Sequence, residues 1–280
     1  MRQSVEHKPC YIIAEIGINH NGSLEQALQL IAAAKEAGCN AVKFQKRTIE
    51  AVYSPDELAK PRTSVFGLTN GDLKRGLEFG LSEYTAIDSY CKSLDIDWFA
   101  SCWDSEAVDF ITQFSPPFYK IASALLTDDE LLIYTRARGK PIILSTGMST
   151  LEQIDHAVEV LGSKDLILLH CMSAYPAYND ELNLLIIPRL YQRYKLPVGY
   201  SGHELGIVTT VAAVAVGACM IERHITLSRG LWGSDQAASL EPEELKELVR
   251  DVRFVEAALG DGIKRVYERE IPIMQKLRRK

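Results

Sequence analysis

Residues 11–45 read YIIAEIGINHNGSLEQALQLIAAAKEAGCNAVKFQ, and this stretch contains one complete strand–helix–strand unit. Two short runs rich in β-branched and aromatic residues, 11–15 and 41–45, flank a segment whose apolar residues follow helical spacing. Ser23 supplies an N-cap for that helix, and Gly38 supplies a stop at its C-terminal end. Strands joined through a helix pair in parallel, so the stretch predicts a βαβ crossover.

The same alternation recurs along the chain and gives eight strand–helix units. Eight such units predict an α/β fold closed into a TIM (β/α)8 barrel. The rival is an open doubly wound sheet, but no strand is followed by a GxGxxG, GxxxxGKS or GxxxxGKT sequence. The predicted strands are Tyr11–Glu15, Ala41–Gln45, Asp97–Ser101, Tyr119–Ile121, Pro141–Ser145, Leu166–His170, Val198–Ser201 and Ala218–His224, and the predicted helices lie near 23–37, 82–94, 104–114, 127–138, 150–161, 181–193, 205–217 and 241–258.

The chain is expected to form one domain over residues 1–280, with the barrel at about 9–260 and a basic tail at 261–280. The connection 46–80 is long for a loop between a strand and a helix. An insertion there is expected to lie over the C-terminal ends of the strands, where a barrel carries its active site.

Composition narrows the class of protein. The 280 residues include 37 acidic and 31 basic side chains, a net charge of -6, which argues against a nucleic-acid-binding surface. No run approaches the ~20 apolar residues of a membrane helix, and residues 1–8 lack the apolar core of a signal peptide. The six cysteines are scattered singly, as in a reduced compartment, so the expected location is the cytoplasm.

Polar side chains gather at the C-terminal ends of the predicted strands. Two lysines and several hydroxyls at one barrel mouth suit a small anion such as a phosphorylated acid, because lysine supplies charge and serine supplies directed hydrogen bonds. The simpler alternative is that the lysines pair with Glu15 and Glu222. The polar residues at or just after these strand ends include Glu15, Lys43, Gln45, Ser101, Lys120, Ser123, Ser145, Cys171, Ser173, Tyr175, Ser201, His203, Glu222, His224 and Asp235.

His203 and His224 end adjacent strands, so both imidazoles are candidates to hold one divalent cation together with Glu15 or Asp235. A structural role for each histidine is the alternative. The remaining histidines are expected to orient loops or to lie on the surface, and Cys102 is expected to be a small polar residue that lines the site rather than a nucleophile.

The sequence resembles the sialic acid synthases, the N-acetylneuraminate synthase family. The resemblance rests on blocks that occur in family order over residues 11–240: YIIAEIGINHNG (11–22), KFQ (43–45), YKIAS (119–123), ILSTGM (143–148), LHC (169–171) with Tyr175-Pro176, YSGH (200–203) and ERH (222–224). A set of this kind is far more specific than any single motif.

The resemblance implies a TIM-barrel transferase that condenses phosphoenolpyruvate with an aldose, usually a mannosamine derivative. It implies a divalent metal on His203 and His224, with Mn2+ expected and Mg2+ or Co2+ as alternatives, and it implies a homodimer or higher homo-oligomer. Glu15 is the expected proton-handling or cation-stabilising carboxylate. The matching donor-site residues are Lys43, Lys120, Ser123, Ser145 and Ser201, those around the sugar are Glu15, Gln45, Tyr175 and Asp235, and Ser173 stands where the family has asparagine.

Some positions depart from the family pattern, including Cys102, Gly202 and Trp232. The sequence also lacks the antifreeze-like C-terminal domain that is usual in the family. We therefore expect this sequence to be either a truncated form or a natural short form. Arg47, Arg62 and Arg229 are exposed-loop candidates for the arginine that this domain supplies. The alternatives kept open are a 3-deoxy-ulosonate synthase acting on another aldose or aldose phosphate, a Schiff-base aldolase, and a non-catalytic barrel scaffold.

Overall fold

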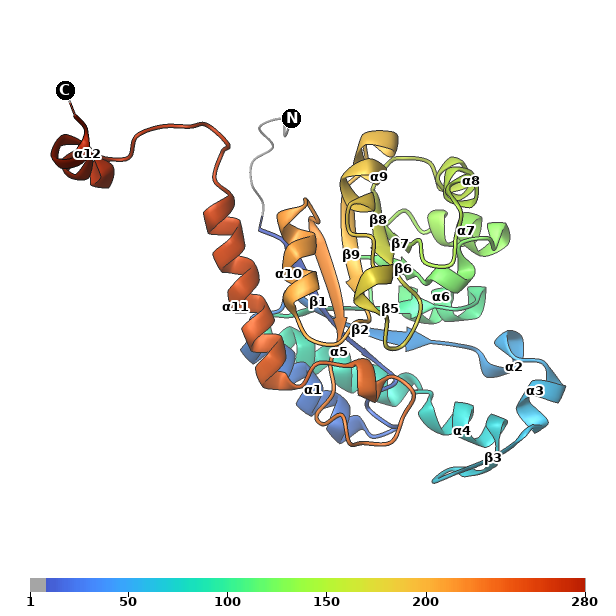
Figure 1. Cartoon of the computed structure of the whole chain (residues 1–280). Helices are drawn as coiled ribbons and strands as arrows, with labels where there is room; N and C mark the ends of the chain where they lie inside the picture. The colour runs from blue at the N-terminus through green and yellow to red at the C-terminus, as the bar shows by residue number, and fades with distance from the viewer. Residues whose placement is uncertain (1–8, 280) are drawn as a thin grey trace.

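The computed structural model describes residues 9–279. Its centre is a closed barrel of parallel strands in the order β1-β10-β9-β8-β7-β6-β5-β2 (Figure 1). This arrangement confirms the predicted barrel and excludes the open sheet. Its eight strands are β1 (Tyr11–Gly17), β2 (Ala41–Lys46), β5 (Asp97–Cys102), β6 (Tyr119–Ile121), β7 (Ile142–Ser145), β8 (Leu166–Cys171), β9 (Val198–Gly202) and β10 (Met220–His224).

Eight helices alternate with these strands and pack around the barrel, as the sequence predicts (Figure 1). In the first of them, the Ser23 hydroxyl accepts a hydrogen bond from the Gln26 amide, and Gly38 ends the helix with a left-handed φ of 88°. The helices are α1 (Leu24–Ala37), α5 (Leu81–Leu94), α6 (Ser105–Thr112), α7 (Asp129–Arg136), α8 (Leu151–Leu161), α9 (Ile186–Tyr194), α10 (Val208–Ala215) and α11 (Pro242–Leu259).

One helix boundary differs clearly from the prediction. Helix α9 begins at Ile186 and not near residue 181, because Asn179–Glu181 form a 3-10 turn and Asn183 takes a left-handed φ of 44°. A left-handed residue cannot lie inside an α-helix, so the helical run starts only after it. The apolar spacing that extends the pattern toward residue 181 includes Leu182, which is buried although it lies outside α9.

The long connection 46–80 forms a small lobe at the C-terminal end of β2 (Figure 1). Its tip reaches the loop after β10, where the Phe66 ring packs edge-on against Trp232 with 5.9 Å between centroids. The lobe therefore lies on the strand-end side of the barrel. The sequence did not reveal its own elements, which are α2 (Ile49–Val52), α3 (Pro55–Ala59), the antiparallel hairpin β3 (Pro61–Ser64) and β4 (Gly67–Thr69), and α4 (Asn70–Leu77).

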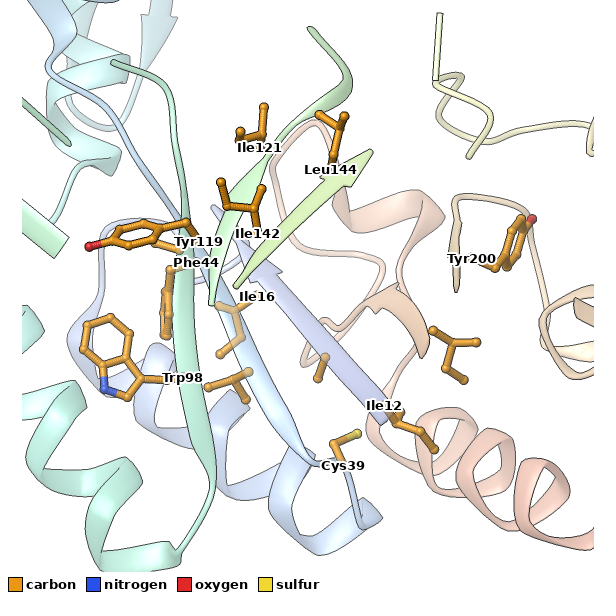
Figure 2. Close-up of a cluster of buried hydrophobic side chains, with 14 of the residues drawn as sticks. Ile12, Ile16, Cys39, Phe44, Trp98, Tyr119, Ile121, Ile142, Leu144 and Tyr200 are labelled. Carbon is orange, nitrogen blue, oxygen red and sulfur yellow. The ribbon is translucent and has the colours of Figure 1, made fainter. Parts of the chain in front are cut away.

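Two apolar clusters hold the barrel together. The larger cluster fills the space between the strands and the helices, and it includes Phe44, Trp98 and Tyr119 (Figure 2). The smaller one plugs the barrel interior and consists of Ile13, Ala41, Phe99, Ile143, Leu169 and Met220. Because side chains alternate along a strand, the residues two positions after this plug also point inward, one layer closer to the strands' C-terminal ends.

The C-terminal part of the chain follows the barrel. Helix α11 packs against α1 and α10, whereas α12 (Ile271–Leu277) stands apart from the barrel (Figure 1). Within residues 9–279, no helix combines the length and the apolar character that crossing a bilayer requires.

Candidate active site

A cavity of about 210 Å³ opens at the C-terminal ends of the barrel strands. All the sequence-predicted site residues line this cavity except Asp235, whose carboxylate lies 4.0 Å from Nδ1 of His224. The floor is set by strand alternation. Two residues after each plug position comes a cavity residue, and these pairs are Ile13/Glu15, Ala41/Lys43, Phe99/Ser101, Ile143/Ser145, Leu169/Cys171 and Met220/Glu222.

The floor carries four buried charged groups. Nζ of Lys43 lies 2.8 Å from Glu15 and 3.5 Å from Glu222, and Nζ of Lys120 lies 3.9 Å from Glu222. The pairing that the sequence allowed as the simpler alternative is therefore present. The same lysines still face the cavity, so pairing and anion binding are compatible in this geometry.

Serine hydroxyls extend this charged floor. Lys43 donates a hydrogen bond of 2.9 Å to Ser101, and Lys120 donates one of 2.7 Å to Ser145. Ser201 donates to Glu222 at 3.0 Å. Lys43, Lys120 and Glu222 thus each have a neutral hydrogen-bonding partner in addition to an ion pair, which offsets part of the cost of burying their charges.

Burial and neighbouring charges move the ionisation of these groups in different directions. Burial raises the pKa of Glu15 to about 7, although the Lys43 ammonium opposes this shift. Burial also disfavours the Glu222 carboxylate, but Lys120 and Lys43 outweigh it and lower the pKa to about 2. Burial would lower the pKa of Lys43, yet Glu15 and Glu222 raise it overall, so Lys43 is an ammonium ion. Burial lowers the pKa of Lys120.

The two histidines lie side by side with ring centroids 5.6 Å apart. Nδ1 of His203 lies 2.6 Å from the Met172 carbonyl and donates to it, which leaves Nε2 as an acceptor for the Tyr175 hydroxyl at 2.9 Å. Burial lowers the pKa of His203, and it lowers the pKa of His224 to about 3, so both rings are neutral. Neutral imidazole is the form that binds a metal ion.

The donor set fits a divalent cation in its chemistry. Nδ1 of His224 is buried without a hydrogen-bond partner, and the Asp235 carboxylate is its nearest acidic neighbour. Residues 9–279 contain no preassembled group of three or more His, Cys, Asp or Glu side chains that could hold a metal ion. Two neutral imidazoles and a nearby carboxylate are the ligand types of open catalytic metal sites.

A second polar wall surrounds Gly147. Its amide donates to the Ser123 hydroxyl at 3.0 Å, and the Ser123 oxygen lies 3.1 Å from the Cys171 sulfur. A Cβ at position 147 would come within 2.2 Å of the Ser173 hydroxyl, so only glycine fits between these groups. The wall presents the hydroxyls of Ser123 and Ser173 to the same cavity that Lys120 lines.

Two predictions made from the sequence are wrong for residues near the site. Cys102 points away from the cavity into the larger apolar cluster, where its thiol contacts the Ala107 carbonyl at 3.6 Å, and burial raises its thiol pKa. Arg47 is not on an exposed loop: its guanidinium stacks 4.3 Å from the Trp103 ring centroid and pairs with Glu78 at 3.6 Å. Arg62 is exposed as expected, and so is Arg229, which pairs with Glu244.

The other histidines play structural roles. His170 lies 2.7 Å from the Leu182 carbonyl, and His20 stacks on Phe79 with centroids 4.0 Å apart. His156 is exposed and pairs with Asp129. His7 lies outside the described residues.

Cavity residues outside the set that the family resemblance selects are Ser101, Trp103, Ala122, Ala124, Met148, Cys171 and Glu222. Strand alternation was the available signal for Ser101, Cys171 and Glu222, since each follows a plug residue by two positions. Trp103 and Met148 lie beyond the ends of β5 and β7, where that alternation no longer applies.

Comparison with known proteins places this cavity in context. The model of the NeuB family matches residues 30–264. The N-acetylneuraminate-9-phosphate synthase of Mus musculus is 40% identical over 274 residues, which cover 96% of this chain and 76% of that protein. The N,N'-diacetyllegionaminic acid synthase of Legionella pneumophila is 37% identical over 286 residues, covering 96% and 79% of the two chains.

A solved structure agrees with these sequence relatives. The crystal structure of N-acetylneuraminic acid (sialic acid) synthetase from Leptospira borgpetersenii, in complex with citrate, superposes with a TM-score of 0.85 at 32% identity. The match covers 99% of this chain and 98% of that one.

Proposed function

This chain belongs to the NeuB family, and from that premise we propose that it condenses phosphoenolpyruvate with a mannosamine-type aldose. The products are a nonulosonic, sialic-type 3-deoxy-ulosonic acid and inorganic phosphate. The observation that carries the proposal is the cavity itself, where two lysines with serine hydroxyls adjoin a pair of neutral histidines. One half of the cavity suits the anionic donor and the other suits the carbonyl of the acceptor.

The lysine-rich half suits phosphoenolpyruvate because it provides charge and directed donors together. Lys43 and Lys120 supply the charge, and the hydroxyls of Ser123, Ser145 and Ser173 supply hydrogen bonds. Much of the rate enhancement is expected from holding the donor's methylene carbon close to the acceptor. Lys43 acts as a cation and not as an amine nucleophile, since its pKa is raised.

In the proposed reaction, the methylene carbon of phosphoenolpyruvate forms a bond to the aldehyde carbon, and the carbonyl oxygen takes up a proton. The neighbouring donor carbon becomes cationic, and water adds there and loses a proton. The carbon–oxygen bond to phosphate then breaks while the added hydroxyl becomes the keto oxygen, and its proton leaves with the phosphate. We assign to Glu15 the stabilisation of that cation or the uptake of a proton, and its buried carboxylate facing the cavity supports this role. One water is consumed and one phosphate is released.

His203 and His224 are the residues that would hold a divalent ion, with Asp235 beside them. Such an ion supplies Lewis-acid polarisation of the aldehyde carbonyl. Mn2+ is the ion we propose, with Mg2+ and Co2+ as alternatives. The Tyr175 hydroxyl hydrogen-bonds Nε2 of His203, so that hydroxyl would have to move aside for this nitrogen to bind an ion.

The oligomeric state and the cellular location of the protein are also parts of the proposal. We propose a homodimer or higher homo-oligomer and a cytoplasmic location, as the resemblance to the sialic acid synthases implies. Light scattering of the purified chain measures the first directly, and a monomer at micromolar concentration would contradict it.

Replacing Lys120 with methionine tests the donor half of the cavity. Lys120→Met removes one cation but keeps the apolar volume, so KM for phosphoenolpyruvate should rise about 100-fold, the loss of a charged hydrogen bond worth ~3 kcal/mol. The matched control is Lys46→Met, because Lys46 is also a mostly buried lysine paired with a glutamate, Glu78, but does not line the cavity. An unchanged KM in Lys120→Met would remove this lysine from the donor site.

The pH dependence of donor binding tests the charge balance around Glu15. With Glu15 ionised, the charges of Lys43, Lys120, Glu15 and Glu222 cancel, whereas protonated Glu15 leaves one net positive charge. The pKa of Glu15 is raised to about 7, so phosphoenolpyruvate affinity should fall as pH rises through that value, by about tenfold. His224 also faces this group but stays neutral above about pH 3.

Calorimetric titration between pH 6 and 8 measures this change. The ligand's own phosphate ionisation, near pH 6, contributes equally to wild type and to Glu15→Gln. The variant should therefore lose the additional fall in affinity near pH 7. Identical pH profiles for the two proteins would show that Glu15 does not titrate in this range.

The function itself is tested by phosphate release from phosphoenolpyruvate with Mn2+ and a panel of aldoses. The panel includes N-acetylmannosamine, mannose, a bacillosamine-type aldose and their 6-phosphates. Release with one sugar and formation of the matching ulosonic acid by mass spectrometry support the proposal. Failure to bind phosphoenolpyruvate at all would overturn it and favour a non-catalytic barrel.

A further inference from the structure

Arg47 lies directly behind the cavity wall, one residue beyond the end of β2. Its guanidinium stacks on Trp103 at 4.3 Å, pairs with Glu78 at 3.6 Å, and donates a hydrogen bond to Oε1 of Gln45. The side chain is only 11% exposed. Both Trp103 and Gln45 line the cavity, but Arg47 does not.

The Gln45 amide lies between two charged groups of opposite kind. Its Nε2 donates to Oε1 of Glu15 at 3.4 Å, and its Oε1 accepts from Arg47. A guanidinium has only donors and a carboxylate has only acceptors, so just one orientation of the amide satisfies both neighbours. The space is tight, because a Cβ at Gly17 would lie 3.0 Å from Glu15 Oε1 and 3.2 Å from Gln45 Nε2.

We infer that Arg47 is a positioning residue that acts through Gln45: it holds the amide oxygen so that the amide NH2 group faces Glu15. Glu78 balances the charge of Arg47, so the guanidinium serves as a fixed set of donors and not as a free cation for substrate. Stacking on Trp103 fixes the plane of that set, which the flexible ammonium of lysine cannot reproduce. The catalytic consequence rests on the proposed function, because it concerns the carboxylate assigned to the reacting centre.

The first test is spectroscopic and does not depend on turnover. In a 15N-labelled protein, the Gln45 side-chain amide resonances are assigned by their loss in Gln45→Leu. We expect them to shift in Arg47→Met and to stay in place in Arg138→Met. Arg138 is the matched control, because it also stacks on an aromatic ring, Tyr134, at 4.3 Å and pairs with Asp109, away from the cavity. Unmoved Gln45 resonances in Arg47→Met would overturn the inference.

The second test is a double-mutant cycle on kcat, measured with the aldose that the phosphate-release panel identifies as the acceptor. Arg47→Met and Gln45→Leu should each lower kcat about tenfold, the scale of one lost hydrogen bond between buried groups, with little change in KM for phosphoenolpyruvate. If Arg47 acts only through Gln45, the double variant is no slower than Gln45→Leu alone. Multiplying losses in the double variant, or an equal loss in Arg138→Met, would contradict this.

The two tests separate the inference from the proposed function. If wild type releases no phosphate with any aldose, the proposed function fails, while the amide resonances still report whether Arg47 orients Gln45. If wild type is active and the Gln45 resonances ignore Arg47, only the positioning role fails.

Discussion

Alanine at His203 or at His224 is expected to lower kcat at least about a thousandfold, because each would remove a ligand of the divalent ion that we propose to polarise the acceptor carbonyl, an effect of several kcal/mol. Both side chains face the cavity and neither belongs to the two apolar clusters. The fold should therefore survive the substitutions. Steady-state phosphate release measures the loss, and circular dichroism with thermal unfolding checks the fold.

The metal role is measured separately from the catalytic loss. Electron paramagnetic resonance measures the binding of Mn2+ to wild type, and we expect this binding to be lost in both alanine variants. His156→Ala is the control, because this histidine is exposed and pairs with Asp129 on the outside of the barrel. Full activity of wild type after exhaustive chelation, or near-normal activity of either alanine variant, would contradict the assignment.

The barrel could be predicted from the sequence because its signals are local. Each strand is a short apolar run and each helix repeats apolar residues at its own period, so eight units can be counted without knowing any contact. Capping residues such as Ser23 and Gly38 fix the ends. The lobe at 46–80 has no comparable signal, because its helices of four to eight residues are too short to show a period.

The sequence could predict which residues line the candidate site, but not which of these side chains and their neighbours contact one another. The cavity residues sit at strand ends, a position that the chain order reveals. Cys102 was misplaced even though alternation was readable, since Phe99 and Ser101 point inward and the next residue must point outward. The contacts of Arg47 were out of reach, because Glu78 and Trp103 come from other elements and meet it only in the fold.

The same limit applies to a buried ion pair beside the histidines. Glu204 follows His203 and Arg223 precedes His224, and both charged side chains are almost completely buried. Arg223 donates to the Glu204 carboxylate at 3.2 Å, to the Glu204 carbonyl at 2.6 Å and to Thr210 at 2.6 Å. The pair therefore ties the end of β9 to the end of β10, on the side of the barrel away from the cavity.

Removing one partner of this pair should be the most destabilising change we predict. Arg223→Met leaves the Glu204 carboxylate buried without its counter-ion, which should lower the free energy of unfolding by ~3–5 kcal/mol. In the double variant Arg223→Met/Glu204→Leu no charge is left uncompensated, so part of that loss should be recovered. Recovery stays incomplete because the hydroxyls of Tyr200 and Thr210 lose their acceptor.

Urea unfolding at pH 7 measures the three proteins, with Arg193→Met as the control for an exposed pair with Asp155. A loss in Arg223→Met no larger than in Arg193→Met would show that the buried charge is compensated by some other group. A double variant as unstable as the single one would mean that the hydrogen bonds of Arg223, and not its charge, hold the strand ends together. Glu204 follows His203 and Arg223 precedes His224, so loss of the pair should displace the two histidines. We therefore expect folded Arg223→Met to bind Mn2+ more weakly than wild type does.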